Sequence, residues 1–260
     1  MSTDSATAAL LAGLAGGTVR VVDLTQPLSE STPVLKLPEP FANTPPLSRR
    51  TLSAYDDAGP AWAWDVLELG EHTGTHFDAP IHWISGRGGE DVASVPATRL
   101  VGPAVVIDRS AEVASDPGYL LTVADIEAFE AEHGRIAPGS WLLFRSGWDA
   151  RAQDAEAFLN AGPEGPVTPG PDAKAARWIA TERDIVGFGV ETVGTDAGAA
   201  GGFDPMFPAH QFLMGNGRYG LTQLANLAEL PPTGAVIVVA PLKLVRGTGS
   251  PARVLAFVGS

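Results

Sequence analysis

The amino-acid sequence predicts an α/β fold built on a mixed sheet. Segments of strand length alternate with segments of helical spacing along the chain. Several strand segments are apolar throughout, which indicates a sheet covered on both faces. With 45% apolar residues among 260, the chain can bury a sizeable core. Because no repeat, linker or low-complexity segment divides it, we expect a single domain over residues 1–260.

The expected elements follow one another in order. A short amphipathic helix begins at Ser5 and continues to about Ala15, where two glycines end it. The predicted strands cover residues 19–25, 61–69, 100–110, 140–148, 184–196, 234–244 and 252–258. The predicted longer helices cover residues 121–134, 170–183 and 219–230. The first of these has clear end signals, with Thr122 as N-cap and Gly134 as C-cap.

A Pro-rich stretch from Pro27 to Pro60 shows little periodicity. It is long for a structureless loop in a compact domain. We therefore expect it to cover a site or to reach a partner subunit.

The charge balance excludes two classes of partner. The chain has 17 Lys and Arg against 30 Asp and Glu, a net charge of −13. Such a surface repels phosphate backbones and anionic lipid, so we expect no nucleic-acid or membrane partner. There is no cysteine, so a metal would be held by imidazole, carboxylate or amide oxygen.

The N-terminal segment does not resemble a secretory signal. It carries an acid and no base ahead of its apolar run, whereas a signal needs a positive start. No stretch approaches the roughly 18 apolar residues that span a bilayer. The default expectation is a cytoplasmic protein.

Three of the five histidines lie within thirteen residues, Glu71 to Trp83. Neither a helix nor an extended strand brings His72, His76 and Asp78 onto one ion. A helix places His72 and His76 on one face but Asp78 roughly on the other side. An extended strand separates the two histidines by about 13 Å. A bend at Gly74 solves the problem, since glycine tolerates the dihedral angles that a bend needs. The glycine therefore favours a His-His-Asp metal site over histidines that are simply satisfied core or surface residues.

The chemistry of this cluster suits a catalytic cation. Two imidazoles and a carboxylate suit Zn²⁺, Mn²⁺ or Fe²⁺ and leave positions open for water and substrate. His82 is then free to act as a general base. Trp62, Trp64 and Trp83 flank the cluster and are either core residues or walls of an aromatic substrate pocket.

The pattern H-x-G-T-H-x-D-x-P-x-H, residues 72–82, resembles the signature of the cyclase-type metal-dependent hydrolases. Bacterial kynurenine formamidases and isatin hydrolases belong to this family. The resemblance extends to the segments DLTQPLSESTPV, LLFRSGW, GVETVGTD and HQFLMGNGRYGLTQLANL, which together cover most of the chain.

The resemblance implies a swivelling β/β/α fold and a homodimer or higher homo-oligomer, with sites near subunit contacts. It implies that His72, His76 and Asp78 bind metal and that His82 is the base. His210 matches a later histidine of the family site. His133, by contrast, precedes a Gly cap and is interpreted as structural. Asp196 either orients a ligand or caps a turn.

Gln223 is a departure from the kynurenine formamidase type, which has Glu at the matching position. The neutral amide makes a second cation less stable, so we expect one Mn²⁺ or Zn²⁺ per chain with Gln223 among its ligands. The Gln also resembles the isatin hydrolase branch of the family.

The expected function is therefore hydrolysis of a small-molecule amide, with a cyclic aromatic amide such as isatin as the first candidate. Arylformamidase activity on N-formylkynurenine is the alternative among enzymes. A non-catalytic, metal-bound binding protein is the alternative from another class, although the intact His82 argues against it.

Overall fold

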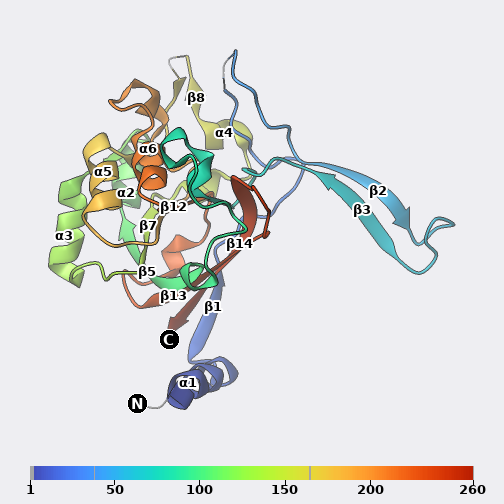
Figure 1. Cartoon of the computed structure of the whole chain (residues 1–260), viewed down its shortest axis with the longest axis horizontal. Coiled ribbons are helices and arrows are strands. Elements are labelled where there is room, and N and C mark those ends of the chain that lie inside the picture. The colour runs from blue at the N-terminus through green and yellow to red at the C-terminus, as the bar shows by residue number, and fades with distance from the viewer. Residues whose placement is uncertain (1–2, 38, 164, 260) are drawn as a thin grey trace.

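The computed structural model describes residues 3–37, 39–163 and 165–259, and it contains an eight-stranded mixed sheet (Figure 1). The strand order is β1-β14-β13-β5-β7-β11-β12-β4, and β14 pairs with β4 as well. Seven strands therefore close into a barrel, with β1 attached outside the ring. The strands are β1 (Val19–Asp23), β4 (His76–Asp78), β5 (Val101–Asp108), β7 (Trp141–Arg145), β11 (Gly187–Val190), β12 (Tyr219–Thr222), β13 (Ala235–Pro241) and β14 (Gly249–Gly259). The predicted α/β class with a mixed sheet is confirmed.

The parallel strands β5, β7, β11 and β12 form the covered part of the sheet. Their side chains alternate between two cores, as strand geometry requires. Leu143 of β7 joins the core that also holds Tyr219, whereas its neighbours Leu142 and Phe144 pack in a second core with residues of the covering helices. Burial on both faces explains why these strands are apolar without alternation.

Helices cover the outside of the sheet, with α3 and α5 on one flank (Figure 1). The helices are α1 (Thr3–Gly16), α2 (Ser110–Ser115), α3 (Val123–His133), α4 (Ala155–Leu159), α5 (Ala173–Thr181) and α6 (Pro208–Gly215). Single 3-10 turns are η1 (Pro80–His82), η2 (Ile84–Gly86), η3 (Ala97–Arg99), η4 (Trp148–Arg151), η5 (Gly198–Gly202) and η6 (Leu227–Glu229). Two-residue strands pair as β6 (Leu120–Leu121) with β10 (Gly170–Pro171), and β8 (Ala161–Gly162) with β9 (Gly165–Pro166). Among the described helices, none is long and apolar enough to cross a bilayer.

The predicted ends of α3 are confirmed. The Thr122 hydroxyl accepts a hydrogen bond from the backbone N–H of Asp125, and the Asp125 carboxylate accepts one from the backbone N–H of Thr122, which forms a capping box. Gly134 follows the last turn with a positive φ of 88°.

The helix predicted over residues 219–230 is wrong. Its first part is β12, held between β11 and β4, and Gln223 then turns the chain with a φ of 52°.

A second difference lies in the Pro-rich stretch, which contains the strand β2 (Ser48–Ala54). This strand pairs with β3 (Ala63–Glu68) to form a hairpin that extends away from the barrel (Figure 1). The strand was not predicted because its polar sequence packs on no core. The helix α1 also lies outside the barrel, and its Leu10, Leu11 and Leu14 are exposed rather than on a buried face.

Candidate active site

The histidine cluster lies where the barrel closes, because β4 pairs with β12 on one side and with β14 on the other. Gly74 has a φ of 64°, so the predicted bend before β4 is present. A Cβ at this position would also lie 2.6 Å from the Leu28 side chain. The single turn η1, started by Pro80, then carries His82 back toward β4. The bend and the turn fold the thirteen-residue motif around one point.

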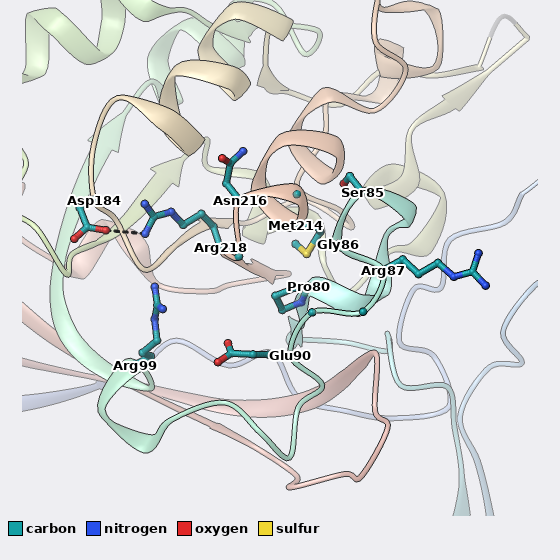
Figure 2. Close-up of a pocket in the computed structure, with 14 residues that line it drawn as sticks. Pro80, Ser85, Gly86, Arg87, Glu90, Arg99, Asp184, Met214, Asn216 and Arg218 are labelled. Carbon is teal, nitrogen blue, oxygen red and sulfur yellow. Dashed lines mark hydrogen bonds and ion pairs between the residues drawn. The ribbon is translucent and has the colours of Figure 1, made fainter.

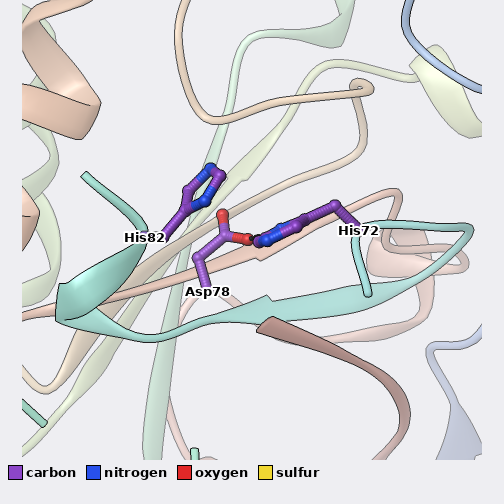
Figure 3. Close-up of side chains that lie close together, drawn as sticks. All are labelled: His72, Asp78 and His82. Atoms are coloured by element: carbon purple, nitrogen blue, oxygen red, sulfur yellow. Dashed lines mark hydrogen bonds and ion pairs between the residues drawn. The ribbon is translucent and has the colours of Figure 1, made fainter. Parts of the chain in front are cut away.

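That point is the carboxylate of Asp78, which is buried. His72, Asp78 and His82 each place one possible ligand atom within 4.8 Å of the others (Figure 3). His76 Nε2 lies 3.4 Å from Asp78 Oδ1, so three imidazoles surround the carboxylate. Burial opposes ionisation of Asp78, but the neighbouring His76 and His72 bring its pKa well below the usual 3.8. Asp78 is therefore an anion in the interior.

The hydrogen bonds of His72 indicate which of its two ring nitrogens carries the proton when the ring is neutral. His72 Nδ1 lies 2.8 Å from Asp78 Oδ1, and Nε2 lies 2.9 Å from Thr248 Oγ1. The Thr248 hydroxyl donates its own proton to Glu71 Oε2, so its oxygen accepts a proton from His72 Nε2. In a neutral ring Nδ1 is then unprotonated and faces the anionic oxygen, whereas a proton on Nδ1 would make it a donor to that oxygen. Either that proton or a cation bound between the two atoms would supply the positive charge that this close contact needs.

His76 repeats the pattern from the other side. Its Nδ1 lies 2.7 Å from the carbonyl oxygen of Gly74, which can only accept, so Nδ1 carries the proton. In a neutral ring Nε2, the nitrogen that lies 3.4 Å from Asp78 Oδ1, is then unprotonated and carries a lone pair. Thr222 Oγ1 also contacts this ring, from the neighbouring strand β12. Nitrogen lone pairs and a carboxylate without a thiolate fit a divalent cation such as Zn²⁺ or Mn²⁺.

His82 stacks on His72, with ring centroids 3.9 Å apart and planes inclined by 30°. Burial, together with the neighbouring imidazoles, lowers the pKa of His82 to about 3, although the Asp78 charge opposes the shift. The ring is therefore neutral near pH 7, with a lone pair available. A neutral imidazole serves either as a base or as a metal ligand.

His210 lies beside His82, with ring centroids 5.5 Å apart. It sits in the first turn of α6, where Asp196 accepts hydrogen bonds from the backbone of Ala209 and His210 and from His210 Nδ1. Burial would lower the pKa of His210, but the Asp196 carboxylate raises it above 6.5. Asp196 thus accepts hydrogen bonds from backbone N–H groups in the first turn of α6 and holds the His210 imidazole.

An aromatic wall stands next to these imidazoles. The Trp83 ring lies 4.8 Å from the His210 ring and 5.8 Å from the Phe207 ring, between centroids. Trp83 Nε1 donates to the side chain of Gln211 on α6, which fixes the indole. Phe207 was not singled out from the sequence, because a phenylalanine 125 residues from the motif gives no local signal.

Two of the three predicted tryptophans do not join this wall within the chain. Trp62 and Trp64 lie on the projecting hairpin and are 48% and 59% exposed. Gln223 is buried next to the cluster: its backbone carbonyl accepts from Thr75, and its amide nitrogen donates to the Pro33 carbonyl at 3.4 Å. His133, interpreted as structural, packs on Phe129 in the last turn of α3.

The structure adds a buried carboxyl that sequence reasoning missed. Glu191 follows β11, and its Oε2 accepts from the backbone and hydroxyl of Ser146 and from the backbone of Trp148. Burial and the nearby Asp149 raise the pKa of Glu191 to about 7. This carboxyl fixes the turn after β7.

A pocket of about 600 Å³ opens beside η1 but lacks this chemistry. None of its described lining residues is a histidine. Figure 2 shows the Glu90 and Arg99 side chains directed into it and Arg218 paired with Asp184. Glu90 accepts a hydrogen bond from the buried Tyr219 hydroxyl. Glu90 in this pocket therefore holds the side chain of the first residue of β12, and the histidine cluster lies outside the described lining.

The comparisons with known proteins agree with the geometry. Residues 22–197 match the Cyclase family model, described as "Putative cyclase". An isatin hydrolase of Roseibium aggregatum is 50% identical over 261 residues, 99% of each chain. A kynurenine formamidase of Salinibacter ruber is 30% identical and covers 72% of this chain and 76% of its own length. The crystal structure of an isatin hydrolase bound to the product analogue thioisatinate, at 49% identity, superposes with a TM-score of 0.98 over 100% of both chains. The chain therefore belongs to the Cyclase family of metal-dependent hydrolases.

Proposed function

We propose that this chain is a metal-dependent amide hydrolase that opens the ring of a cyclic aromatic amide of the isatin type. The observation that carries the proposal is the convergence of His72 Nδ1 and His76 Nε2 on one oxygen, Oδ1, of the buried Asp78. The relationship to an isatin hydrolase over nearly the whole length of both chains supports the substrate class and a single catalytic domain over residues 1–260.

We assign His72, His76 and Asp78 as ligands of one Mn²⁺ or Zn²⁺ per chain. Gln223, next to Thr222 at the end of β12, completes the set with its amide oxygen. Because that oxygen is neutral, the site carries less negative charge than a site with Glu would, which disfavours a second cation. When bound, the cation polarises the substrate carbonyl and acidifies water.

His82 moves the proton in this mechanism. Its neutral ring accepts a proton from the attacking water, and the nearby Asp78 carboxylate favours the charged ring that results. The hydroxyl adds to the carbonyl carbon and the carbon–nitrogen bond breaks. His82 then returns the proton to the leaving nitrogen, so the product is a carboxylate with a free aromatic amine.

His210 stabilises negative charge on the substrate oxygen. Asp196 occupies its Nδ1, so the Nε2 edge remains for the substrate. The raised pKa increases the fraction of His210 that is protonated at both nitrogens, and Nε2 then donates a hydrogen bond. Trp83 supplies a flat apolar face beside this donor, which suits an aromatic substrate.

Turnover of a substrate panel with added Mn²⁺ or Zn²⁺ tests the proposal. The panel contains isatin, N-formylkynurenine, aromatic lactams and linear aliphatic amides. We expect isatin to have the highest kcat/KM and the aliphatic amides the lowest. Preference for N-formylkynurenine would support the arylformamidase reading, and equal turnover of aromatic and aliphatic amides would contradict the aromatic wall. A homo-oligomeric state and a cytoplasmic location are further parts of the proposal, tested by sedimentation and by fractionation of cells.

A further inference from the structure

Two arginines face each other in the pocket of about 600 Å³ beside η1, where Figure 2 shows the Arg99 side chain directed toward that of Arg218. Arg218 Nη1 donates to Asp184 Oδ1 and to the carbonyl oxygen of Ile185, whereas its Nη2 makes no hydrogen bond within the described residues. The Arg99 guanidinium lies over the Tyr219 ring, 5.4 Å from its centroid, and has no ion pair or hydrogen bond in that part of the chain. Like charges directed toward each other repel, so this arrangement favours an anion between them.

The carboxylates of the pocket do not take that place. The Asp184 side chain is 73% exposed, so water screens its ion pair with Arg218. Glu90 Oε2 accepts a hydrogen bond from the Tyr219 hydroxyl at 2.5 Å. Among residues 3–37, 39–163 and 165–259, no ion pair joins Glu90 to Arg99 or to Arg218. The two guanidinium groups therefore keep hydrogen-bond donors for an anion that comes from outside the chain.

The size and lining of the pocket suit an organic ion rather than an inorganic one. A volume of about 600 Å³ lies in the range of sites for small organic molecules. Pro80 and Met214 give the pocket apolar surface beside the two arginines. A Cβ at Gly88 would meet no atom within 4 Å, so the wall at this glycine is open. A ligand with a small apolar body and one charged group fits these surroundings.

The charges indicate which anion fits. A guanidinium group presents its N–H donors as a planar fork, which matches the two oxygens of a carboxylate. Figure 2 shows the Glu90 carboxylate directed into the same pocket. A second negative charge on the ligand would be repelled by Glu90, which disfavours a phosphate dianion. The pocket therefore favours a monocarboxylate.

The pocket also shares structural elements with the active site, because η1 carries His82 and α6 carries His210. The backbone between these elements is closely packed. A Cβ at Gly86 would lie 2.1 Å from the carbonyl oxygen of Pro80 and 2.8 Å from that of Met214. Close-packed backbone transmits small displacements, so a ligand in the pocket should affect the placement of the two imidazoles.

We propose that this pocket is a second binding site, in which Arg99 and Arg218 hold a small organic monocarboxylate between them. Its occupancy alters turnover through η1 and α6. The binding rests on the pocket alone, whereas the effect on turnover rests on the proposed function.

Isothermal titration calorimetry with benzoate tests the binding on the metal-loaded protein. Arg99→Gln should weaken binding at the pocket at least about tenfold, the usual order for loss of a hydrogen bond to a charged group. Arg87→Gln is the matched control, because Figure 2 shows the Arg87 side chain directed away from the other two arginines. It removes the same charge and should leave the affinity within about twofold. Neutral benzamide should bind at least about tenfold more weakly than benzoate.

Benzoate that binds at the proposed cation should bind there equally in Arg99→Gln, so the difference between the two proteins isolates the pocket. If benzoate binds Arg99→Gln as tightly and in the same amount as the wild type, or binds neither protein, the second site is refuted.

Glu90→Gln distinguishes selection by charge from damage to the fold. Glutamine keeps an oxygen that accepts from the Tyr219 hydroxyl but lacks the negative charge. Inorganic phosphate should bind the wild type more weakly than benzoate does, and should bind Glu90→Gln at least about threefold more tightly than the wild type. A damaged pocket would not gain affinity. Equal phosphate binding by both proteins, or a wild type that prefers phosphate, would overturn the assignment to a monocarboxylate.

Turnover at saturating isatin tests the effect on the active site. Benzoate should change kcat at least about twofold in the wild type and in Arg87→Gln, but not in Arg99→Gln. Benzoate that merely competes with isatin would leave kcat unchanged in all three proteins, which would refute the effect on turnover. A wild type that does not hydrolyse isatin would instead refute the proposed function, and calorimetry would still decide the binding.

Discussion

Thr248→Val should weaken metal binding although Thr248 is not proposed as a ligand. The hydroxyl accepts a proton from His72 Nε2 at 2.9 Å and donates to Glu71. Valine has nearly the same shape but can neither accept a hydrogen bond from His72 nor donate one to Glu71. The His72 tautomer with its proton on Nε2 and its lone pair toward Asp78 is therefore no longer stabilised. Loss of a partner that orients a ligating histidine usually costs about 10- to 100-fold in affinity. That factor corresponds to about 1.4–2.7 kcal/mol.

Competition of the protein with a fluorescent chelator for Zn²⁺ or Mn²⁺ measures this effect directly. Thr248→Ser is the matched control, because it keeps the hydroxyl and should bind within about threefold of the wild type. Thermal unfolding in excess chelator separates a loss of affinity from a loss of fold. If the valine variant binds the cation as tightly as the wild type and the serine variant, the hydroxyl does not set the His72 tautomer. The inferred orientation of the His72 Nδ1 lone pair toward Asp78 would then be refuted.

Three further outcomes follow from the site. Elemental analysis of protein purified without chelator should find about one divalent cation per chain, and His76→Ala should lose it; a value near two would contradict the interpretation of Gln223. His82→Ala should keep the cation while kcat falls about 10²–10⁴-fold, the usual contribution of a positioned base; loss of the cation would make His82 a ligand. The wild-type protein should lose stability as the pH rises through the range in which Glu191 ionises, and the Glu191→Gln variant should not. The folded carboxyl has a pKa of about 7 against an ordinary 4.5, so the unfolded state releases its proton first, and up to about 3 kcal/mol is lost across that interval. Urea unfolding at pH 5 and pH 8 should show this loss in the wild type and not in the variant.

The parts of the site that sequence reasoning could find are those encoded locally. The spacing of His72, His76 and Asp78 and the glycine between them describe a bend, and the bend is present at Gly74. The covered strands were predictable for the same reason, because burial on both faces leaves a continuous apolar run. The supporting groups were not. Thr248 contacts His72 across 176 positions of sequence, and a threonine carries no signal of its own.

Errors in the predicted elements have one physical origin. Residues 219–230 have helical spacing, yet tertiary pairing between β11 and β4 makes their first part a strand. The alternation of residue types along residues 61–69 correctly indicated a strand. It did not indicate which surface covers that strand. A Trp-x-Trp pattern is the same whether its face packs on its own barrel or on another molecule. The local pattern of residues therefore predicted which side chains share a face. The strand topology determines what that face packs against.

The place of the site in the fold links the cation to the closure of the barrel. Strand β14 closes the ring by pairing Gly249 with Asp78 and Pro251 with His76. The approach is close enough that a Cβ at Gly249 would lie 2.4 Å from the His72 ring, so only glycine fits there. The buried Asp78 carboxylate would oppose this closure if its charge were uncompensated. A cation bound by the proposed ligands would compensate it and would hold residues on both sides of the bend before β4. In the proposed mechanism, the chemistry of the site and the closing of the barrel therefore depend on the same few side chains, which lie on and beside the shortest strand of the barrel.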